Sequence, residues 1–263
     1  MGDASILHMP TALIFGGNGK TARELTKILR DAETPHTIFS VIRNPDQIPD
    51  LQAIGAKPIV QDIATASEAD FINIIQGTRP DVVVWAASGK DLKSAEAVDR
   101  DGAIRLMDAL SKAEHVPARR YVVISALDIR DRENRPVPDW YTDADEKLSD
   151  RMWGIIGPIL RAKLAADTEL RVGNAARRLD YTIVRPGGLS EGPGTGKIRA
   201  GKVGTIGMIP REDVAGVIYA AIQNKKTYGL AFDILGPKDG SLTIQEAVSQ
   251  VARDHEDTFE GYY

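Results

Sequence analysis

The chain has 263 residues with a formal net charge of −4, no cysteine and only four histidines. Without cysteine it has no disulfides, no thiolate zinc site and no cysteine nucleophile, and the few histidines predict no metal site. The acidic balance argues against nucleic acid as a partner, because phosphate binding needs a basic surface. No apolar stretch approaches a membrane span and Met1–Met9 does not resemble a signal peptide, so we expect no membrane partner and a cytoplasmic location.

Short apolar runs alternate with longer amphipathic stretches, which predicts strands alternating with helices. The expected strands are Thr11–Phe15, Thr37–Ile42, a short one at Pro58–Val60, Asp81–Trp85, Tyr121–Ser125 and Tyr181–Arg185. The expected helices are Lys20–Arg30, Glu68–Gln76 and Ser94–Ala113. Nearly continuous apolar strands are typical of a parallel sheet that is covered on both faces. The sequence therefore predicts an α/β fold, a doubly wound parallel sheet of the Rossmann type, in a single domain over residues 1–263.

Two segments that follow the fifth and sixth strands lack this alternation. Asp128–Asp145 is polar, contains Trp140 and Tyr141, and is expected to be a loop. Ser190–Thr205 is rich in glycine and basic residues and is expected to be a loop or a small hairpin. Ligands of open α/β sheets bind at the carboxyl ends of the strands, so both segments are predicted to wall a substrate site. The alternative is that they are only surface connections.

A glycine-rich turn joins the first strand to the first helix. Its residues are Gly16, Gly17, Asn18, Gly19, Lys20, Thr21 and Ala22. Gly17, Gly19 and Ala22 satisfy the G-x-G-x-x-A pattern, in which glycines allow a tight turn and a close approach of backbone to a pyrophosphate. Free N–H groups at the helix start, together with Lys20, would attract the phosphates. The turn predicts binding of a nicotinamide dinucleotide, unless its glycines serve the chain geometry alone.

The end of the second strand indicates which dinucleotide is bound. An NAD-specific site would place Asp or Glu there, whereas this chain has Arg43, which can pair with a 2′-phosphate. We therefore expect NADP(H) to be preferred over NAD(H), unless Arg43 is an ordinary surface cation. Asp62 and Ile63 follow the third strand and are expected near the adenine. Small residues after the fourth strand would let the cofactor pass close to the backbone, and these are Ala86, Ala87 and Ser88.

Four blocks resemble the atypical, NmrA-like branch of the short-chain dehydrogenase/reductase superfamily, over Thr11 to about Ala252. The blocks are GGNGKTA in the glycine-rich turn, LRAKLAADTEL at Leu160–Leu170, DYTIVRPGGLSEGPGTGKI at Asp180–Ile198 and IPREDVAGVI at Ile209–Ile218. The resemblance implies that Pro186 and Gly187 lie against the nicotinamide. It also implies that Lys163 binds the nicotinamide ribose and that Ser125 holds the substrate oxygen.

The resemblance breaks at the proton donor. Typical members have a tyrosine four residues before this lysine, on the same helix face, and this chain has Ile159 there. No tyrosine of the chain is followed by a lysine four residues later. Tyr141, Asp128 or ordered water could supply the proton instead. Pro158 also breaks the helical pattern just before Ile159 and is expected to reshape the pocket wall.

Three functions are compatible with this pattern. The first is an NADP(H)-dependent oxidoreductase acting on a small carbonyl, imine, activated alkene or quinone-like acceptor, with Ser125, Lys163 and Tyr141 as catalytic residues. The second is a non-catalytic NADP(H) redox sensor of the NmrA type. The third is an isomerase or cyclase that retains the cofactor structurally. We favour the first function, with a small molecule as the partner, and the sequence leaves monomer and homodimer open.

Overall fold

Each apolar run that predicts a strand forms one in the computed structural model, which describes residues 9–89, 91–117 and 119–263. These strands are β1 (Thr11–Phe15), β2 (Thr37–Ile42), β3 (Lys57–Val60), β4 (Val82–Trp85), β5 (Arg120–Ile124) and β6 (Asp180–Pro186). They are followed by β7 (Gly188–Ser190), β8 (Lys197–Ala200), β9 (Met208–Pro210), β10 (Ala231–Leu235) and β11 (Leu242–Thr243). Residues 1–8, which include most of the segment searched for a signal peptide, lie outside the described residues.

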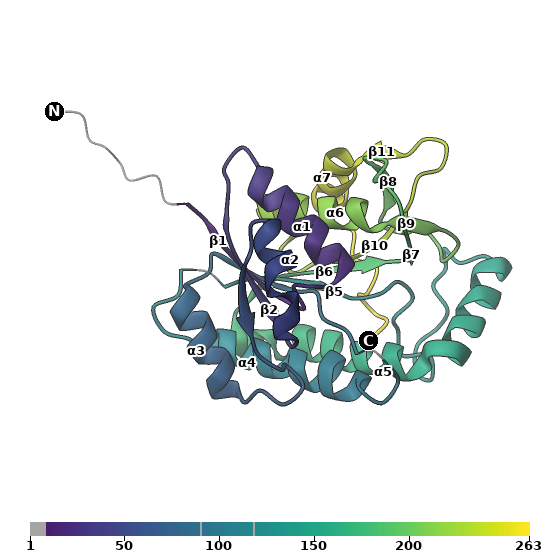
Figure 1. Ribbon diagram of the computed structural model, residues 1–263. Helices are drawn as coiled ribbons and strands as arrows, with labels where there is room; N and C mark the ends of the chain where they lie inside the picture. The colour runs from purple at the N-terminus through teal and green to yellow at the C-terminus, as the bar shows by residue number, and fades with distance from the viewer. Residues whose placement is uncertain (1–8, 90, 118) are drawn as a thin grey trace.

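The main sheet has nine strands in the order β11-β8-β10-β6-β5-β4-β1-β2-β3 (Figure 1). The chain builds outward from β1 to β3 on one side, and then from β4 through β10 on the other. All neighbouring pairs from β3 to β10 are parallel, whereas β8 is antiparallel to both β10 and β11. A reversal of strand order beside β1 defines a doubly wound fold, which confirms the predicted fold class.

Helices connect these strands and lie on both faces of the sheet. The α-helices are α1 (Lys20–Asp31), α2 (Ile48–Ala53), α3 (Glu68–Thr78), α4 (Ala103–Lys112), α5 (Asp143–Arg177), α6 (Arg211–Gln223) and α7 (Ile244–Asp254). The 3₁₀ turns are η1 (Pro45–Gln47) and η3 (Lys225–Thr227), and η2 (Glu96–Gly102) is a π-helix directly before α4. The single helix predicted over Ser94–Ala113 therefore contains a change of helical pitch.

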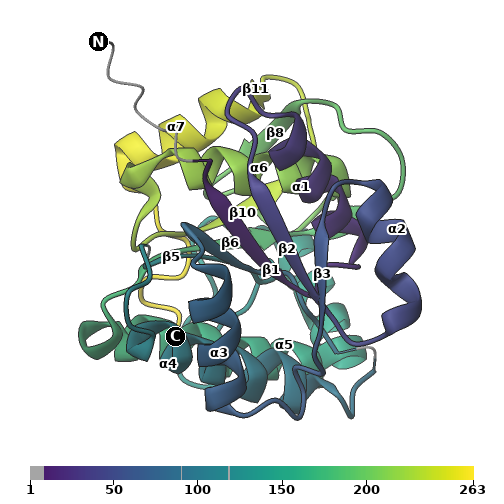
Figure 2. The ribbon, with the colours of Figure 1, turned by 60° about the vertical axis from the view of Figure 1, so that its left-hand side comes forward.

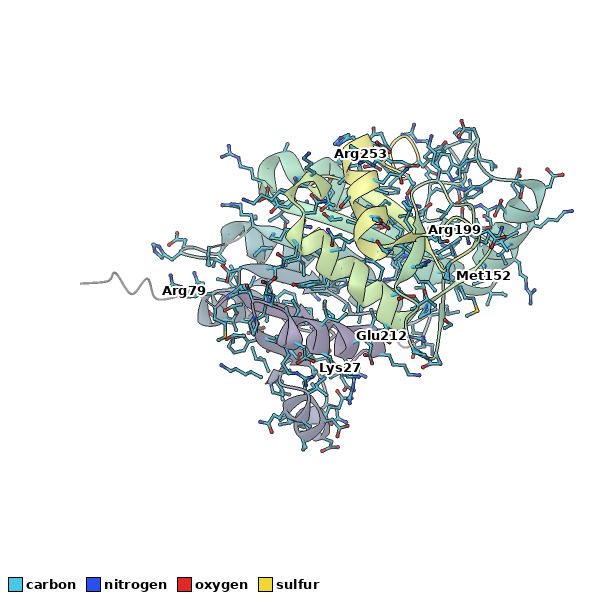
Figure 3. All side chains as sticks on the ribbon, turned by 90° about the horizontal axis from the view of Figure 1, so that it is seen from above. Lys27, Arg79, Met152, Arg199, Glu212 and Arg253 are labelled. Atoms are coloured by element: carbon cyan, nitrogen blue, oxygen red, sulfur yellow. The ribbon has the colours of Figure 1, made fainter. Side chains whose placement is uncertain are left out.

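The core lies in two layers, one on each side of the sheet (Figures 1 and 2). Alternate residues of a strand point to opposite faces, so Ala12 and Ile14 pack with α1, α6 and α7. Leu13 and Phe15 pack on the other face with α3, α4 and α5. Figure 3 looks down on the first of these faces, with α1, α6 and α7 lying across the sheet. Because both faces are covered, the strands are apolar throughout, as the sequence shows.

The first substrate-side loop is shorter than predicted, because α5 begins at Asp143 and not after Asp145. Thr142 and Asp145 form a capping box, in which each side chain accepts a hydrogen bond from the other's backbone N–H. The predicted interruption near Pro158 is a kink at Ile156 (φ −120°, ψ 19°), and the helix continues beyond it. The kink turns the first part of α5 away from the sheet, at the right of Figure 1.

The second predicted loop, Ser190–Thr205, contains a strand of the main sheet and no hairpin. Lys197–Ala200 forms β8, which lies between β10 and β11. The prediction of a loop or a small hairpin was wrong here. The four-residue strand is flanked by glycines, which indicate a loop, and its partner strands β10 and β11 lie later in the sequence. Only the stretches on either side of β8 are irregular.

Among the residues that the structure describes, no helix is long and apolar enough to cross a membrane. No group of three or more His, Asp or Glu side chains in that part of the chain is arranged to hold a metal ion.

Candidate cofactor and active site

The glycine-rich turn is held between the ends of β2 and β4. The N–H groups of Gly16 and Gly17 both donate to the backbone oxygen of Val41, at 3.1 Å each. Gly16 has a φ of +79°, and a Cβ atom there would lie 2.6 Å from the Cα of Ala87. Only glycine fits this position, because both the left-handed backbone and the contact with Ala87 exclude a side chain.

Gly19 ends the turn and begins α1. No side chain caps α1 and its first turn carries no acidic residue, within the described part of the chain. The free N–H groups of this first turn therefore form an anion-binding end. A Cβ on Gly19 would lie 3.2 Å from the Gly16 oxygen, so the glycine keeps the entrance to these groups open.

A cleft of about 410 Å³ runs from this helix end along the carboxyl ends of β1 to β4. Nine of the predicted cofactor residues line it, and these are Gly16, Asn18, Gly19, Arg43, Asp62, Ile63, Ala86, Ala87 and Ser88. The sequence interpretation missed further lining residues, among them Asn44, Gln47, Gln61, Gly89 and Val98. Most of these residues are neighbours in sequence of predicted positions at the same strand ends. Extending each predicted strand end by one residue would have identified them.

Among the turn residues that do not line the cleft are Gly17 and Thr21. A Cβ on Gly17 would lie 2.4 Å from the Cβ of Ser40, so this glycine allows the turn to pack on β2. Thr21 is buried in the first turn of α1. Gly17 therefore contributes backbone geometry, because its N–H already donates to Val41, and Thr21 is expected to offer a backbone N–H to a bound phosphate and no side chain.

Lys20 is exposed and does not line the cleft. Its Nζ atom lies 2.8 Å from Glu191, which also pairs with Arg211 at 2.8 Å. The side chains of Lys20 and Glu191 are 67% and 68% exposed, so the pair is weak and Lys20 remains within reach of an incoming anion.

Pro186 and Gly187 lie at the end of β6, outside the cleft. Pro186 is buried and pairs with Ile234 of β10. The N–H of Gly187 donates to the Ile234 oxygen at 3.0 Å, and a Cβ on Gly187 would lie 2.2 Å from a methyl group of Leu235. The structure explains the glycine by packing on β10, and the predicted contact with a nicotinamide stays a prediction.

The rim of the cleft at β2 carries a cation. Arg43 is exposed there, and Asn44 beside it accepts a hydrogen bond from the Asp46 N–H at 3.0 Å. Asp46 lies in η1 and does not line the cleft, whereas Asp62 lines it from the end of β3. One oxygen of Asp62 accepts from the Ala64 N–H at 3.0 Å, so this carboxylate also shapes its own turn.

Lys163 does not line the cleft and is connected to its lining residue Gly89 through Asp99. Its Nζ atom is 2.9 Å from Asp99 and 3.5 Å from the backbone oxygen of Ile124. Asp99 is buried in η2 and also accepts a hydrogen bond from the Gly89 N–H at 2.7 Å. The sequence interpretation missed Asp99, because no pattern in the sequence marks the π-helix that turns it toward Lys163.

Ser125 follows β5 and donates its hydroxyl hydrogen to Asp167 of α5. Both residues are buried, with 5% and 2% of their surface exposed. Burial raises the pKa of Asp167 to about 6, although the Ser125 hydrogen bond and the Lys163 charge act in the opposite direction. Asp167 was also missed, although it lies four residues after Lys163 and thus on the same helix face.

Tyr141 and Asp128 occupy a separate polar cluster under the first loop. Burial, then the carboxylates of Asp233 and Asp128, raise the pKa of Tyr141 far above its usual range. Asp128 accepts hydrogen bonds from Arg130 at 3.2 Å and from the Trp153 Nε1 at 3.1 Å. Asp128 is thus an engaged buried acceptor, and the raised pKa of Tyr141 makes this hydroxyl group a weak acid.

The C-terminal segment His255–Tyr263 packs on its own domain. Phe259 is fully buried, and the Tyr262 ring lies 5.5 Å from the half-buried Trp140 of the first loop. Arg171 of α5 pairs with Asp257 at 2.6 Å. The segment thus covers the base of the substrate-side loop.

This fold and this cleft define a protein that binds a dinucleotide at the carboxyl end of a parallel sheet. Residues 16–225 match the profile of a family described as NAD(P)H-binding. The chain therefore belongs to the NAD(P)H-binding family, which confirms the resemblance to atypical short-chain dehydrogenases/reductases.

Three proteins are similar to this chain over nearly its full length. A UPF0659 protein of Schizosaccharomyces pombe is 33% identical over 244 residues, covering 92% of this chain and 94% of the relative. YhfK of Bacillus subtilis, named an uncharacterized sugar epimerase, is 30% identical over 241 residues, covering 90% of this chain and 98% of the relative. A Bacillus halodurans structure described as an NAD-dependent epimerase/dehydratase superposes with a TM-score of 0.71 at 29% identity, covering 92% and 99% of the two chains.

Proposed function

We propose that the protein is an NADPH-dependent reductase of a small carbonyl, imine, activated alkene or quinone-like acceptor. The observation that supports this most is the continuity of the site. Gly19 at the start of α1, Arg43 at the rim and Gly89 all line one cleft. The Gly89 N–H donates to Asp99, which pairs with Lys163, and Lys163 reaches the backbone oxygen of Ile124, the residue before Ser125. A pure cofactor-binding module would need the cleft but not the buried Ser125–Asp167 pair that is connected to it.

The protein's own residues would divide the work along this cleft. The N–H groups at the start of α1 would hold the pyrophosphate, and Arg43 the 2′-phosphate. Lys163, kept in place by Asp99, would bind the nicotinamide ribose, and Ser125 would hold the substrate oxygen. The nicotinamide supplies the hydride when it is bound.

The preference for NADP(H) rests on the charges at the β2 end. Arg43 is exposed on the rim, and no carboxylate of β2 or of the residue after it lines the cleft. A ribose 2′-phosphate there would meet a cation, whereas an NAD-specific site needs an acceptor for the 2′-hydroxyl. Cytoplasmic location and the small-molecule partner stay predictions of the sequence, which leaves monomer and homodimer open.

An epimerase or isomerase that retains its cofactor is the second candidate. The descriptions of the Bacillus relatives favour it, and the missing tyrosine is compatible with it. Such an enzyme returns the hydride to its substrate, so it would not consume NADPH. A redox sensor would bind NADPH with no turnover of any acceptor.

Titration of the purified protein with NADPH and NADH tests the cofactor assignment. Nicotinamide fluorescence is measured for the wild type, for Arg43→Ala and for Arg253→Ala as control, since Arg253 is exposed on α7, away from α1 in Figure 3. We expect Arg43→Ala to lose about tenfold or more in NADPH affinity, the value of one charge-assisted contact, and to leave NADH affinity unchanged.

NADPH consumption then separates the functions. We expect oxidation of NADPH with para-nitrobenzaldehyde or with menadione, a carbonyl and a quinone probe. Binding of NADPH without its consumption by either acceptor would remove the reductase proposal and favour the epimerase or sensor. If neither cofactor binds, all three functions fall together.

A further inference from the structure

Asp167 lies directly behind the serine that would hold the substrate oxygen. Ser125 stands at the carboxyl end of β5, fixed by its N–H bond to the Val184 oxygen at 2.8 Å. Its Oγ atom is the hydrogen-bond partner of Asp167, whose surface is only 2% exposed. A proton on Asp167 therefore has a direct route to Ser125.

The positively charged side chains around Asp167 form ion pairs with other carboxylates. Lys163 pairs with Asp99 at 2.9 Å, Arg171 with Asp257 at 2.6 Å, and Arg185 of β6 with Asp233 at 3.0 Å. Tyr121 of β5 also faces this carboxyl group and is completely buried.

Within the described residues, no cation forms an ion pair with Asp167 itself. A buried carboxyl group in such surroundings favours its neutral acid form. Burial accordingly raises the pKa of Asp167 to about 6.

The protonation of Asp167 decides what Ser125 can offer to a substrate. When Asp167 is a carboxylate, it accepts the only hydrogen of the serine hydroxyl, and Ser125 presents lone pairs alone. When Asp167 is an acid, its own O–H can donate to the serine oxygen. The serine hydrogen is then free to donate to a substrate oxygen.

We infer that Asp167, acting through Ser125, supplies the proton that a tyrosine at position 159 would otherwise give. The inference rests on the proposed reductase function. The substrate carbon gains hydride and forms a C–H bond, while the electron pair of its C=O bond moves to oxygen. That oxygen takes the proton of Ser125, and Ser125 takes the proton of Asp167. The Asp167 carboxylate regains a proton from water through Ser125 after the product leaves.

The first test needs neither cofactor nor substrate. Infrared difference spectra of the protein between about pH 4 and pH 8 report the carbonyl stretch of a protonated buried carboxyl group. We expect such absorption in the wild type, lost as the pH rises, and a weaker band in Asp167→Asn, which keeps the contribution of Asp233. Asp233→Asn serves as the comparison for the other buried acid with a raised pKa. Identical spectra for wild type and Asp167→Asn would overturn the inference.

The second test follows single-turnover NADPH oxidation with para-nitrobenzaldehyde and menadione between about pH 5 and pH 8. In the wild type the rate should fall as the pH rises through the titration of Asp167. Asp167→Asn still donates a hydrogen bond but has no proton to give, so its rate should drop about 100-fold or more and lose this pH dependence. Asp254→Asn on α7 is the matched control and should behave like the wild type.

The outcomes separate the two claims. If the wild type consumes NADPH but Asp167→Asn keeps its rate and pH profile, the proton route is wrong and the reductase stands. If the wild type consumes NADPH with neither acceptor, the proposed function fails and the proton route falls with it. Ser125→Ala with an unchanged rate would also overturn the route, because the route passes through the Ser125 hydroxyl group.

Discussion

At the scale of single residues, the site depends on positions where only one residue type fits. Gly16 is the clearest, because its φ is positive and the Ala87 backbone lies where a side chain would be. The G-x-G-x-x-A pattern in the sequence begins one residue later, at Gly17, so it indicated the turn but not that Gly16 carries the left-handed backbone. Asp99 and Asp167 could not be predicted as partners, because each pairing joins elements that meet only in the folded sheet.

Gly16→Ala should destabilise the fold and weaken NADPH binding. The left-handed backbone and the 2.6 Å contact act together, so we expect a loss of about 2 kcal/mol or more in unfolding free energy. Gly77→Ala on α3 is the matched control, since no atom lies within 4 Å of the added methyl group. That change should stabilise slightly, by up to about 1 kcal/mol. Urea unfolding checks both variants, and equal losses would contradict the account of Gly16.

At the scale of elements, the start of α5 organises the substrate side. The oxygens of Asp145 accept from Thr142 at the helix cap and from the Thr205 N–H, at 2.6 Å, in the segment after β8. Although burial acts to raise it, these hydrogen bonds lower the pKa of Asp145 to about 2. The Thr142-to-Asp145 spacing is a capping signal in the sequence, but the polar composition of the segment led to the prediction of a loop.

Asp145→Ala should detach this helix start from the Thr205 segment. Loss of a cap and of one buried contact should cost about 1–3 kcal/mol at neutral pH. Because the pKa is lower in the folded protein, the stabilisation is present above about pH 4 and disappears as the pH falls toward 2. The difference between wild type and variant in urea unfolding should therefore shrink as the pH falls from about 4 toward 2. Asp143→Ala, an exposed neighbour, should change little.

At the scale of the whole molecule, the sheet and its two layers follow from the strand and helix periodicity, and the sequence predicted them well. Two parts of the structure outside this alternation, the strand β8 and the C-terminal segment, were less predictable. β8 has antiparallel partners on both sides from later parts of the chain, and the tail folds back through Phe259. Such contacts depend on which distant segments reach the same edge, and a local pattern carries no information about this.

Stability should depend on pH through the buried acids. The folded-state pKa of Asp167 and of Asp233 lies near 6, above the ordinary value of 3.8, because both are buried. Their contribution is therefore complete below about pH 4 and is lost as the pH rises through 6, by about 1–3 kcal/mol each. His36 acts in the opposite sense, since burial lowers its pKa. The difference between wild type and Asp167→Asn, measured by urea unfolding, isolates one acid and should shrink from pH 5 to pH 8.

The three tryptophans are distributed unevenly over this architecture. Trp85 is buried in the core against Phe15, whereas Trp140 contacts the tail and Trp153 binds Asp128 under the substrate-side loop. Movement of that loop would therefore change the environment of two indole rings and leave the third untouched. The tryptophan fluorescence of the protein would therefore change if the loop closed over a substrate. The emission of Trp85 in the core would stay constant and serve as an internal reference.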